Sequence, residues 1–430
     1  MSAIEEKSGL YKIFNKLFYK LARSYLRIKK PYLIVTAGSV GKTSAKMFAG
    51  QLLQTEKKVR YMSDSYNSGL GLYLSVFNIK VPTIIINPFA WIWRVVVALL
   101  NFLLPKPDFM VLEYGISAVG EMDEMLEFAK PSASILTAVT PEHMEFLKDI
   151  DTVAREETKI ISATKEVAFI NSDDVDNKYL SDLSKVFFFG SKSENKAKYK
   201  IHKIDGDGAT VDFIVGETIF ENVKLKIISE PLIRLLCGSA ALALHVGVSK
   251  ESIQSTLEEI DSVPGRMRLL NGANNSSLID DTANFSPSAG IGALKTLKAF
   301  NAKRRIVVFG NMHELGDYEA KGFSDVGAEF KDIDQFVFVG PLARKYFTPI
   351  VQKAGYEFGK NLYEFEDAIT AGKVVRKMLQ PGDVVIIKGP FGGYYLEECT
   401  KQLLNNPKDS TKLTRQSNFW LRKKRAIFNT

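Results

Sequence analysis

Two features that the sequence has little of exclude several kinds of protein. Its 430 residues include only two cysteines, Cys237 and Cys399. Two thiols cannot form a disulfide framework or a cysteine-rich metal site, so the composition fits a reducing compartment and we expect both thiols to be small core residues. The first ten residues, MSAIEEKSGL, contain two glutamates and no apolar run. We therefore expect no signal peptide there.

Uninterrupted apolar runs are also short. The segment PTIIINPFAWIWRVVVALLNFLLPKP is apolar from Trp91 to Leu104 except for Arg94 and Asn101, and prolines bound it. This run is shorter than the ~20 residues that a membrane-spanning helix needs. We predict that the insert at residues 83–107 forms a buried or interfacial helix.

The formal net charge of +8 is unevenly distributed. Basic residues concentrate between Lys12 and Lys30 and in the C-terminal sequence LRKKRAIFNT. Such patches suit an anionic partner, either a membrane surface, a nucleic acid or a phosphorylated substrate. Two solvated basic ends are an equal alternative. The hydrophobic content of 46% and the charged content of 25% are ordinary for a soluble globular protein, and the length suffices for two or three domains.

Residues 10–28 have the periodicity of one amphipathic helix. Apolar residues recur at spacings of three and four, and basic residues fall on the opposite side. The apolar set is Leu10, Ile13, Phe14, Leu17, Leu21, Tyr25 and Ile28, and the basic set is Lys12, Lys16, Lys20, Arg23 and Arg27. This pattern is typical of a helix that lies on a membrane surface. Packing on the protein's own core or on a second subunit is the alternative, and the sequence leaves both open.

Apolar strands separated by helical stretches predict an α/β fold with a mostly parallel sheet covered on both faces. The first strands are YLIVTAG, DFMVLEYG and ASILTAV. The short strands KVFFFG, KYKIHKI, ATVDFIV and VKLKIIS predict a small antiparallel appendage, and an apolar helix follows over residues 232–247. Beyond SVPGRMRLL the alternation restarts with SSLIDD, RRIVVFG, QFVFVG and DVVIIKG, which predicts a second, Rossmann-like α/β domain.

The stretch VTAGSVGKTSAKMFAGQLL has the pattern of a phosphate-binding loop between a strand and a helix, the helix being predicted over residues 44–53. Glycines let backbone N–H groups turn towards phosphate oxygens, and the helix N-terminus adds positive potential. Lys42 supplies a mobile cation for the outer phosphates, and the Thr43 hydroxyl suits Mg²⁺. The strict pattern has glycine where Thr36 stands. We predict that Gly38, Ser39, Val40, Gly41, Lys42, Thr43 and Ser44 bind a nucleotide. The sequence has no guanine-reading Asn-Lys-x-Asp motif, which favours ATP over GTP.

Five stretches resemble segments of the Mur ligases, in the same order along the chain. TAGSVGKTS resembles their ATP loop, which characteristically begins with Thr or Ala, and VLEYGISAVGEMDEM resembles their strand-end glutamate segment. TAVTPEHMEFLKDIDTVAREETKII resembles the histidine segment, and VPGRMRLL with LIDDTANFSPSA resembles the interdomain arginine and the Asp-Asp-x-x-Asn motif. RRIVVFGNMHELGD with GDVVIIKGPFG resembles the C-terminal domain. The resemblance covers about residues 31–400 and is closest to the branch that adds D-alanyl-D-alanine to the muramoyl tripeptide.

The resemblance implies a ligase that transfers the ATP γ-phosphate to a substrate carboxylate, after which an amine attacks the acyl phosphate to give an amide. Catalysis of this kind is mainly electrostatic. By the same resemblance, Lys42 holds the γ-phosphate, Thr43 holds one Mg²⁺, and Glu113 and His143 hold a second Mg²⁺. Arg266 would reach the nucleotide phosphates across the domain cleft, Asp281 and Asn284 would contact ribose or adenine, and Asn67 and Lys388 would lie on the substrate side. Without the resemblance, His143 reads as an ordinary polar loop residue and DDTANFSP as a turn.

Glu157 is one departure from the family pattern. It stands where these ligases usually carry a lysine that becomes carbamylated and helps to position Mg²⁺. Glutamate presents a carboxylate on a shorter arm, so our hypothesis is that Glu157 replaces the carbamate without CO₂. A solvated charge on a helix is an equal alternative.

Other departures concern the nucleotide, the amine and the acceptor. Pro231, Leu232 and Leu235 stand where polar residues usually contact the nucleotide, and Asn311 stands for an aspartate. Pro390 and Phe391 stand where serine and arginine are common, so we expect an altered amine-donor site. About 30 residues precede the first strand, which leaves no room for the family's N-terminal UDP-binding domain. We therefore expect the acceptor to be recognised by another route.

Taken together, these features predict a cytoplasmic acid–amino-acid ligase that requires ATP and Mg²⁺ and acts in peptidoglycan precursor or related cell-wall synthesis. Its catalytic residues would be Lys42, Glu113, His143 and Glu157. Its partners would be a small-molecule or lipid-linked carboxylate and an amino acid or dipeptide amine, without nucleic acid, and with peripheral association at the inner membrane face. The expected parts are the basic helix (1–30), the central ATP-binding domain (31–262), the C-terminal domain (263–410) and a basic tail (411–430). Two alternatives stay open: an inactive ATP-binding protein at the membrane, and a ligase for another polymer such as polyglutamate.

Overall fold

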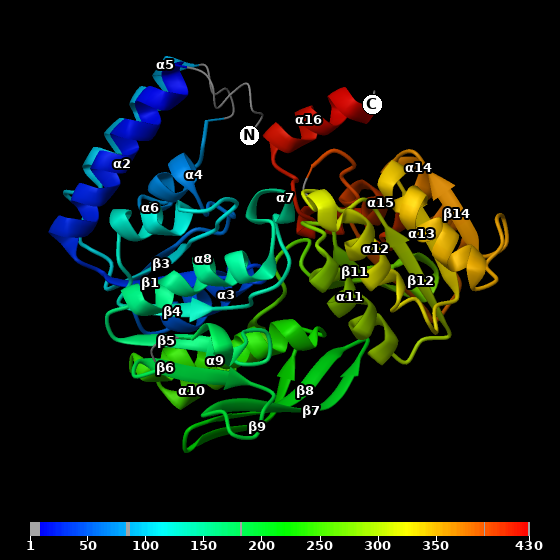
Figure 1. Ribbon diagram of the computed structural model, residues 1–430, viewed down its shortest axis with the longest axis horizontal. Helices are drawn as coiled ribbons and strands as arrows, with labels where there is room; N and C mark the ends of the chain where they lie inside the picture. Colours follow the sequence, from blue (N-terminus) through cyan, green and yellow to red (C-terminus); the bar gives the residue numbers. More distant parts are fainter. Residues whose placement is uncertain (1–8, 83–86, 181–182, 391, 429–430) are drawn as a thin grey trace.

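The computed structural model describes residues 9–82, 87–180, 183–390 and 392–428. Two lobes lie side by side, each built around its own sheet (Figure 1). We refer to residues 9–260 as the first lobe and to residues 268–428 as the second lobe. Residues 261–267 connect them.

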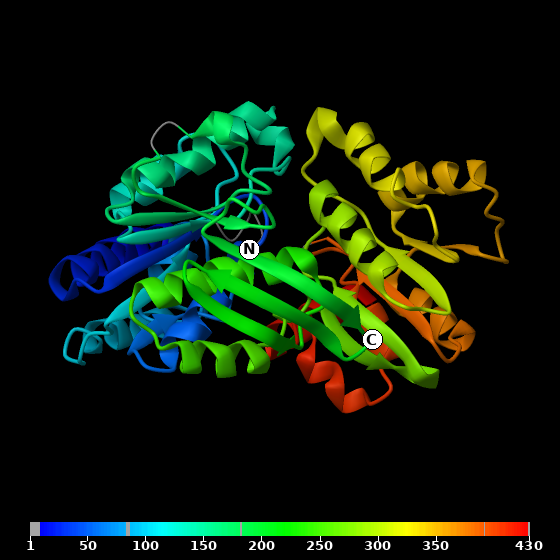
Figure 2. The same ribbon diagram turned by 90° about the horizontal axis from the view of Figure 1, so that it is seen from below.

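The first lobe contains a nine-stranded sheet of order β2-β3-β1-β4-β5-β6-β7-β8-β9. Strands β2 to β7 pair in parallel, and β7, β8 and β9 pair antiparallel. Their bounds are β1 Tyr32–Ala37, β2 Val59–Tyr61, β3 Phe109–Glu113, β4 Ala133–Leu136, β5 Val167–Asn171, β6 Val186–Gly190, β7 Ala197–Asp205, β8 Gly208–Val215 and β9 Thr218–Leu225. Figure 2 shows the antiparallel strands running from the first lobe towards the second.

One sequence-based strand assignment was wrong. KVFFFG was predicted to belong to the antiparallel appendage, but β6 pairs in parallel with β5 through Ala168↔Val186 and its neighbours. The appendage therefore begins at β7. The sequence analysis did not identify β5, the strand with which β6 pairs.

Helices cover both faces of this sheet, as the sequence predicted. Helices α3, α9 and α10 pack in one hydrophobic cluster, and α2, α4, α5, α6 and α8 pack in another on the opposite side. Their bounds are α2 Gly9–Lys29, α3 Lys42–Gln54, α4 Gly69–Ser75, α5 Pro88–Leu100, α6 Glu121–Phe128, α7 Met144–Leu147, α8 Ile150–Ala163, α9 Glu230–His245 and α10 Lys250–Glu259. A short 3₁₀ turn, η1, covers Asn177–Tyr179.

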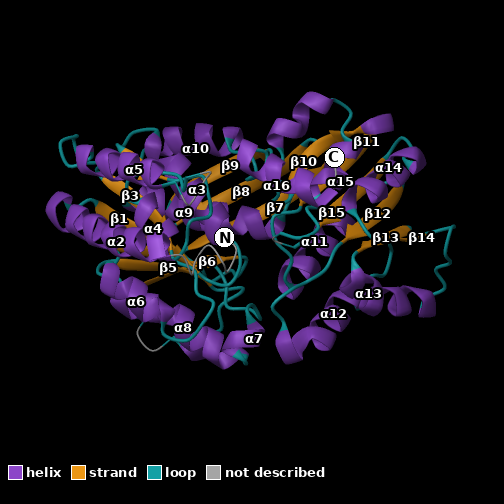
Figure 3. Ribbon diagram, turned by 90° about the horizontal axis from the view of Figure 1, so that it is seen from above, coloured by secondary structure: helices purple, strands orange, loops and turns teal. Residues whose placement is uncertain are grey.

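The helices α2 and α5 lie side by side at the outer edge of the first lobe (Figures 1 and 3). Phe14 stacks on Trp91 with 5.0 Å between ring centroids, and Tyr25 meets Phe102 edge-on at 5.4 Å. Both contacts join residues 77 positions apart in the sequence, so the two helices run parallel. Within the described residues, no helix combines the length and the apolarity needed to cross a bilayer.

The second lobe contains a six-stranded sheet of order β10-β11-β15-β12-β13-β14, parallel except for β10. The bounds are β10 Arg268–Gly272, β11 Ser276–Asp281, β12 Arg304–Phe309, β13 Gln335–Val339, β14 Leu362–Phe365 and β15 Asp383–Lys388. The four predicted parallel strands are present as β11, β12, β13 and β15. The sequence analysis did not identify the edge strands β10 and β14.

Helices of the second lobe are α11 Pro287–Ala299, α12 Glu319–Gly327, α13 Pro341–Lys353, α14 Ala368–Met378, α15 Glu397–Leu403 and α16 Asn418–Phe428. Short 3₁₀ turns are η2 Ala273–Asn275, η3 Gly316–Tyr318 and η4 Pro407–Lys412. The C-terminal segment is anchored by the buried Glu397, which pairs with Arg415 at 2.6 Å and Lys424 at 2.8 Å. Arg415 also donates to the carbonyl oxygen of Thr282 at 2.5 Å. The segment is therefore fixed to the loop that follows β11.

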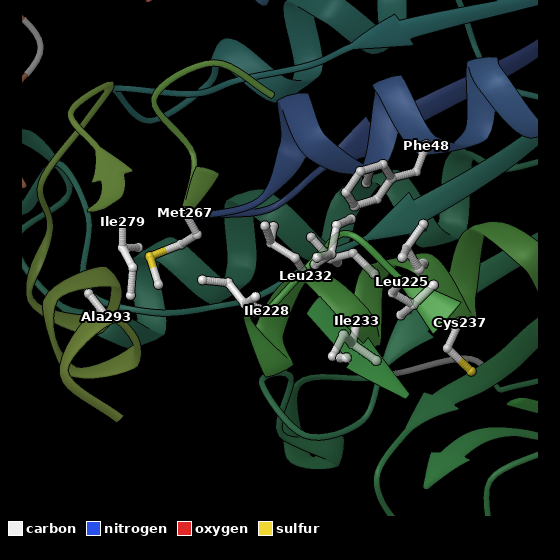
Figure 4. Close-up of a cluster of buried hydrophobic side chains, with 14 of the residues drawn as sticks. Phe48, Leu225, Ile228, Leu232, Ile233, Cys237, Met267, Ile279 and Ala293 are labelled. Carbon is white, nitrogen blue, oxygen red and sulfur yellow. The ribbon is translucent and has the colours of Figure 1, made fainter. Parts of the chain in front are cut away.

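Apolar side chains from the two lobes form one continuous cluster. Ile228 and Leu232 from the first lobe lie beside Met267 and Ile279, as Figure 4 shows. Polar contacts add to this seam: the Glu145 N–H donates to the Glu314 carbonyl at 3.2 Å. The lobes are thus held against each other around the cleft described next.

Candidate functional site

The predicted phosphate loop turns between β1 and α3. Gly38 and Gly41 have φ values of 121° and 89°, a region that favours glycine. A Cβ atom on Gly38 would lie 2.4 Å from Thr137 Oγ1, and one on Gly41 would lie 2.7 Å from Leu235 Cδ1. The loop therefore needs both glycines, and its geometry fits a backbone cradle at a helix N-terminus.

Thr36, which stands where the strict loop pattern has glycine, supports the loop. Its side chain is fully buried, and its hydroxyl donates to the carbonyl oxygen of Lys42 at 3.1 Å. This bond ties Thr36, the second-to-last residue of β1, to Lys42, the first residue of α3. The departure from the pattern is thus compatible with the loop's shape.

Lys42 curls over the loop that precedes it. Its Nζ donates to the carbonyl oxygens of Gly38 at 2.5 Å and Ser39 at 2.8 Å, and lies 3.7 Å from Glu142 Oε2. These acceptors hold the ammonium at the place where a phosphate group on the loop would need a cation. Phosphate oxygens would compete with these carbonyls for the same donor.

Oxygen donors converge at the C-terminal ends of β1 and β3. The hydroxyls of Thr43 and Ser65 both donate to Glu113 Oε1, at 3.1 Å and 3.0 Å, and lie 3.0 Å from each other. Burial opposes ionisation of Glu113, but the charges of Lys46 and Lys42 outweigh it and hold its pKa below its usual value. Lys46 Nζ lies 3.0 Å from Glu113 Oε2. Glu113 is therefore a carboxylate.

This donor set suits a magnesium ion that also binds phosphate oxygens. Hydroxyl and carboxylate oxygens are the ligands that Mg²⁺ prefers, and it is commonly held by one or two carboxylates plus substrate phosphates. Among the residues that the structure describes, no group of three or more His, Cys, Asp or Glu could hold a metal ion without such help. The residues present fit a Mg²⁺–nucleotide complex better than a free metal ion.

His143 lies at the junction of the lobes. It precedes α7 with a left-handed φ of 52°, and its Nδ1 lies 2.5 Å from Glu314 Oε2 of the second lobe. Burial lowers the pKa of His143, but the Glu314 hydrogen bond and the nearby Glu142 charge outweigh it and raise the pKa above its ordinary value. The metal role of His143 stays a prediction, and in this arrangement the side chain joins the lobes.

Glu157 lies on α8 and is 1% exposed. Its Oε2 accepts a hydrogen bond from the Gly38 N–H at 2.8 Å. Burial raises its pKa to about 7, against the opposing effect of Lys42. The side chain thus supports the phosphate loop from behind and is not a solvated charge on a helix surface.

The second lobe places Asp281, Asn284 and Lys388 together. Lys388 is 1% exposed, and its Nζ lies 2.5 Å from Asp281 Oδ2 and donates to the Asn284 carbonyl at 3.1 Å. Asp281 Oδ1 accepts from the Met267 N–H at 3.2 Å, next to Arg266 in the connection between the lobes. Burial lowers the pKa of Lys388, and Asp281 opposes this. The substrate role of Lys388 stays a prediction, since Asp281 already holds its ammonium.

A cleft of about 2090 Å³ brings these groups together between the lobes. Every predicted site residue lines it except Gly38, which begins the phosphate loop, and Glu157, which lies behind that loop. Asn67 lines the wall next to Glu113, and its carbonyl oxygen accepts from the Gly115 N–H at 2.9 Å. The helices α2 and α16 add Tyr11 and Trp420 to the cleft wall.

Sequence reasoning missed four residues of this site: Lys46, Ser65, Glu142 and Glu314. Lys46 could have been found, because residues four apart on a helix share a face and Lys42 begins α3. Glu142 adjoins His143 in the sequence. Ser65 and Glu314 reach the site through the fold, and no local pattern marks them.

Two departures from the family pattern have clear places in the structure. Leu232 and Leu235 are buried on α9 and line the cleft beside the phosphate loop, so they give the cleft an apolar wall. Asn311 Oδ1 accepts from the N–H groups of Leu342 and Ala343, both at 3.0 Å, and so satisfies the N-terminus of α13. Pro390 lines the cleft, and Phe391 lies outside the described residues.

Two family models match the chain: the Mur ligase middle domain over residues 35–242, and the Mur ligase glutamate ligase domain over residues 265–391. The UDP-N-acetylmuramoyl-tripeptide–D-alanyl-D-alanine ligase of Bacillus subtilis is 23% identical over 394 residues, which are 90% of this chain and 79% of that protein. The crystal structure of MurF ligase from Thermotoga maritima in complex with ADP matches with a TM-score of 0.76 at 21% identity, covering 93% of this chain and 84% of that one. Folylpolyglutamate synthase from Mycobacterium tuberculosis, also complexed with ADP, matches with a TM-score of 0.60 at 15% identity, covering 87% and 92%.

Proposed function

The chain belongs to the Mur ligase family of ATP-dependent ligases, and from this membership and the geometry of the cleft we propose that it joins a carboxylate to an amine through an acyl phosphate. One observation carries the proposal. Lys42, Thr43 and Glu113 converge at the mouth of a phosphate loop, inside a cleft that a second lobe closes. Such an arrangement suits phosphoryl transfer, which depends on positioning and on stabilisation of negative charge.

We propose the following roles on the first lobe. The backbone of residues 38–44 binds the phosphates of ATP, and Lys42 moves from its carbonyl acceptors to the γ-phosphate. The oxygens of Thr43 and Glu113, with Ser65 beside them, would hold Mg²⁺, which shields phosphate charge when it is bound. Glu157 keeps the loop in shape through the Gly38 N–H, in place of the carbamylated lysine of related enzymes.

Arg266, in the connection between the lobes, would reach the phosphates, and Asp281 and Asn284 of the second lobe would contact the ribose or the adenine. His143 and Glu314 would bring the lobes together once ATP is bound. Asn67 and Lys388 would lie towards the carboxylate and the amine. We propose residues 31–262 and 263–410 as the two catalytic domains, each of which supplies part of the proposed site.

The substrates we propose follow the named relatives. Their names describe addition of D-alanyl-D-alanine to a UDP-linked muramoyl tripeptide. We propose a muramoyl-peptide-type carboxylate, free or lipid-linked, and a dipeptide amine for this chain, in peptidoglycan precursor synthesis. The same relatives do not favour an inactive protein or a polyglutamate ligase. Because ATP and such precursors occur inside the cell, we propose a cytoplasmic location, and we propose separately that the enzyme associates with the inner membrane face.

The test is phosphate release from ATP with Mg²⁺, measured against pairs of carboxylates and amines. The carboxylates are muramoyl tripeptides, with and without UDP or a lipid diphosphate, and γ-glutamyl acceptors; the amines are D-alanyl-D-alanine and single amino acids. We expect release that requires both partners of one pair and that falls about a thousandfold in Lys42→Met. The matched control is Lys165→Met, an exposed lysine outside the cleft. Release that is unchanged in Lys42→Met would refute the role of the loop.

A further inference from the structure

An exposed apolar stripe runs along the outer face of α5 and the turn that follows it. The stripe consists of Phe89, Ile92, Trp93, Val96, Leu99, Leu100 and Leu103. At 100° per residue these positions fall within a sector of about 120°. Phe89 is 79% exposed, Trp93 is 63% exposed and Leu103 is 81% exposed. The opposite side of the same helix, with Trp91 and Ala98, is buried.

This stripe differs from the scattered apolar residues of an ordinary protein surface. Monomeric soluble proteins rarely expose contiguous apolar patches larger than a few hundred Å², and larger ones mark interaction sites. Here every strongly exposed position of α5 after its first turn is apolar. The helix therefore has two apolar sides, of which only one contacts the described chain.

A row of basic residues lies on the exposed side of α2, the helix that packs against α5. Lys16, Lys20 and Arg27 are exposed, and helical geometry places them within a sector of about 40°. The exposed Ile13 and Ile28 flank this row on one side of α2. The sequences of α2 and of residues 88–107 contain no aspartate or glutamate. Glu127 of α6 approaches this region, at 3.8 Å from Arg23.

We propose that this face docks on an anionic membrane surface. The apolar stripe of α5 would enter the boundary between headgroups and acyl chains, and the basic row of α2 would lie on the anionic headgroups. This division of an apolar face from a flanking basic face is what holds interfacial helices on membranes. The charge of α2 selects a lipid surface over a second copy of the chain, because pairing two such faces would bring like charges together.

The docked face adjoins the entrance to the cleft. Tyr11 and Asn15, near the start of α2, line the cleft wall, whereas Lys16 and Lys20 face outwards. A membrane-bound enzyme would thus open its cleft close to the lipid surface. This arrangement suits a carboxylate substrate carried on a lipid, which is the lipid-linked form of the acceptor proposed above and rests on that proposal. Docking itself needs no ligase activity.

The experiment is co-sedimentation of the full chain with vesicles at low salt. One set of vesicles is phosphatidylcholine alone, and the other is an equimolar mixture of phosphatidylcholine and phosphatidylglycerol. We expect binding to the anionic vesicles that weakens as salt is added. The triple variant Lys16→Glu, Lys20→Glu, Arg27→Glu should bind about a hundredfold more weakly, at roughly tenfold or less per charge. Lys331→Glu, Lys353→Glu, Lys373→Glu, on the second lobe, makes the same change in net charge and should bind like the parent.

The apolar stripe is tested separately. Trp93→Ser with Leu100→Ser should bind at least tenfold more weakly, whereas Phe358→Ser, an exposed apolar residue of the second lobe, should not. Tryptophan emission should shift to shorter wavelength on binding, and this shift should vanish in Trp93→Phe. Circular dichroism and thermal melting establish that each variant is folded.

Three outcomes would overturn the docking proposal: no binding to anionic vesicles at low salt, equal binding to both kinds of vesicle, or equal weakening by both triple variants. Light scattering gives a fourth. A dimer in solution that becomes a monomer in Trp93→Ser would assign the stripe to a second copy of the chain. Because no arm of this experiment uses ATP, it can fail while the ligase assay succeeds, and the reverse also holds.

Discussion

Glu157 allows a test that separates stability from activity. Its burial makes the ionised carboxylate costly for stability, whereas its hydrogen bond to Gly38 supports the phosphate loop. Its carboxyl has a pKa of about 7 in the folded protein, against 4.5 for an unperturbed glutamate. The folded state therefore binds a proton that the unfolded state has already released between these two values. Since stability falls with pH wherever the folded state holds more protons, the protein loses stability as pH rises from about 4.5 to about 7.

The magnitude follows from the size of the shift. A difference of about 2.5 pKa units, at about 1.4 kcal/mol each, corresponds to about 3.5 kcal/mol when the carboxyl is fully ionised in both states. Glu157→Gln cannot ionise, but its amide oxygen still accepts the Gly38 N–H. We therefore expect Glu157→Gln and the parent to be equally stable below pH 4.5 and the variant to be about 3 kcal/mol more stable at pH 8.

The assay is urea unfolding of the protein without nucleotide or divalent cation, at pH 4.5 and pH 8. Glu258→Gln, an exposed position on α10, is the control and should follow the parent at both pH values. Parallel loss of stability in Glu157→Gln and the parent would refute the reasoning from burial. In the ligase assay, Glu157→Gln should be about as active as the parent, because its amide oxygen still accepts the Gly38 N–H, whereas Glu157→Ala, which lacks an acceptor, should be slower. Undiminished activity in Glu157→Ala would remove Glu157 from the mechanism.

Three further predictions concern the loop, α13 and the C-terminal segment. Gly41→Ala should weaken ATP binding at least tenfold by calorimetry, and Leu235→Ala should restore it only in part, because the left-handed backbone remains strained. Asn311→Ala should cost about 1–2 kcal/mol in urea unfolding through loss of an N-terminal cap, whereas Asn311→Asp should be nearly neutral. Arg415→Ala should cost about 2–3 kcal/mol in urea unfolding, because the buried Glu397 loses its charged hydrogen bonds to Arg415 but keeps Lys424 as a partner.

Local patterns predicted most of the fold. Periodicity or spacing within one segment was enough to predict the helix at residues 10–28, the central strands of both sheets and the phosphate loop. The strand β10 escaped prediction because its residues read as the boundary between the domains, although it forms a hairpin with β11. The strand β14 is a short edge strand, and its pairing is decided by β13, further back in the sequence. The placement of KVFFFG failed for the same reason: its residues favour a strand, but only the position of β5 makes the pairing parallel.

The site was less predictable than the fold. Lys42, Thr43 and Glu113 follow from one loop and one strand end, and the fold brings them together. The contact of Glu157 with Gly38 joins residues 119 positions apart, and that of His143 with Glu314 joins the two lobes. Such contacts depend on how the helices and the lobes are placed in space, and local sequence patterns do not predict that placement.

The apolar seam in Figure 4 makes the contact between the two lobes depend on temperature. Separating the lobes would expose Ile228, Met267 and Ile279 to water, so the parted form has the higher heat capacity. Attraction between apolar surfaces weakens on cooling. Lowering the temperature towards freezing should therefore favour the parted form, and warming from there should draw the two halves together.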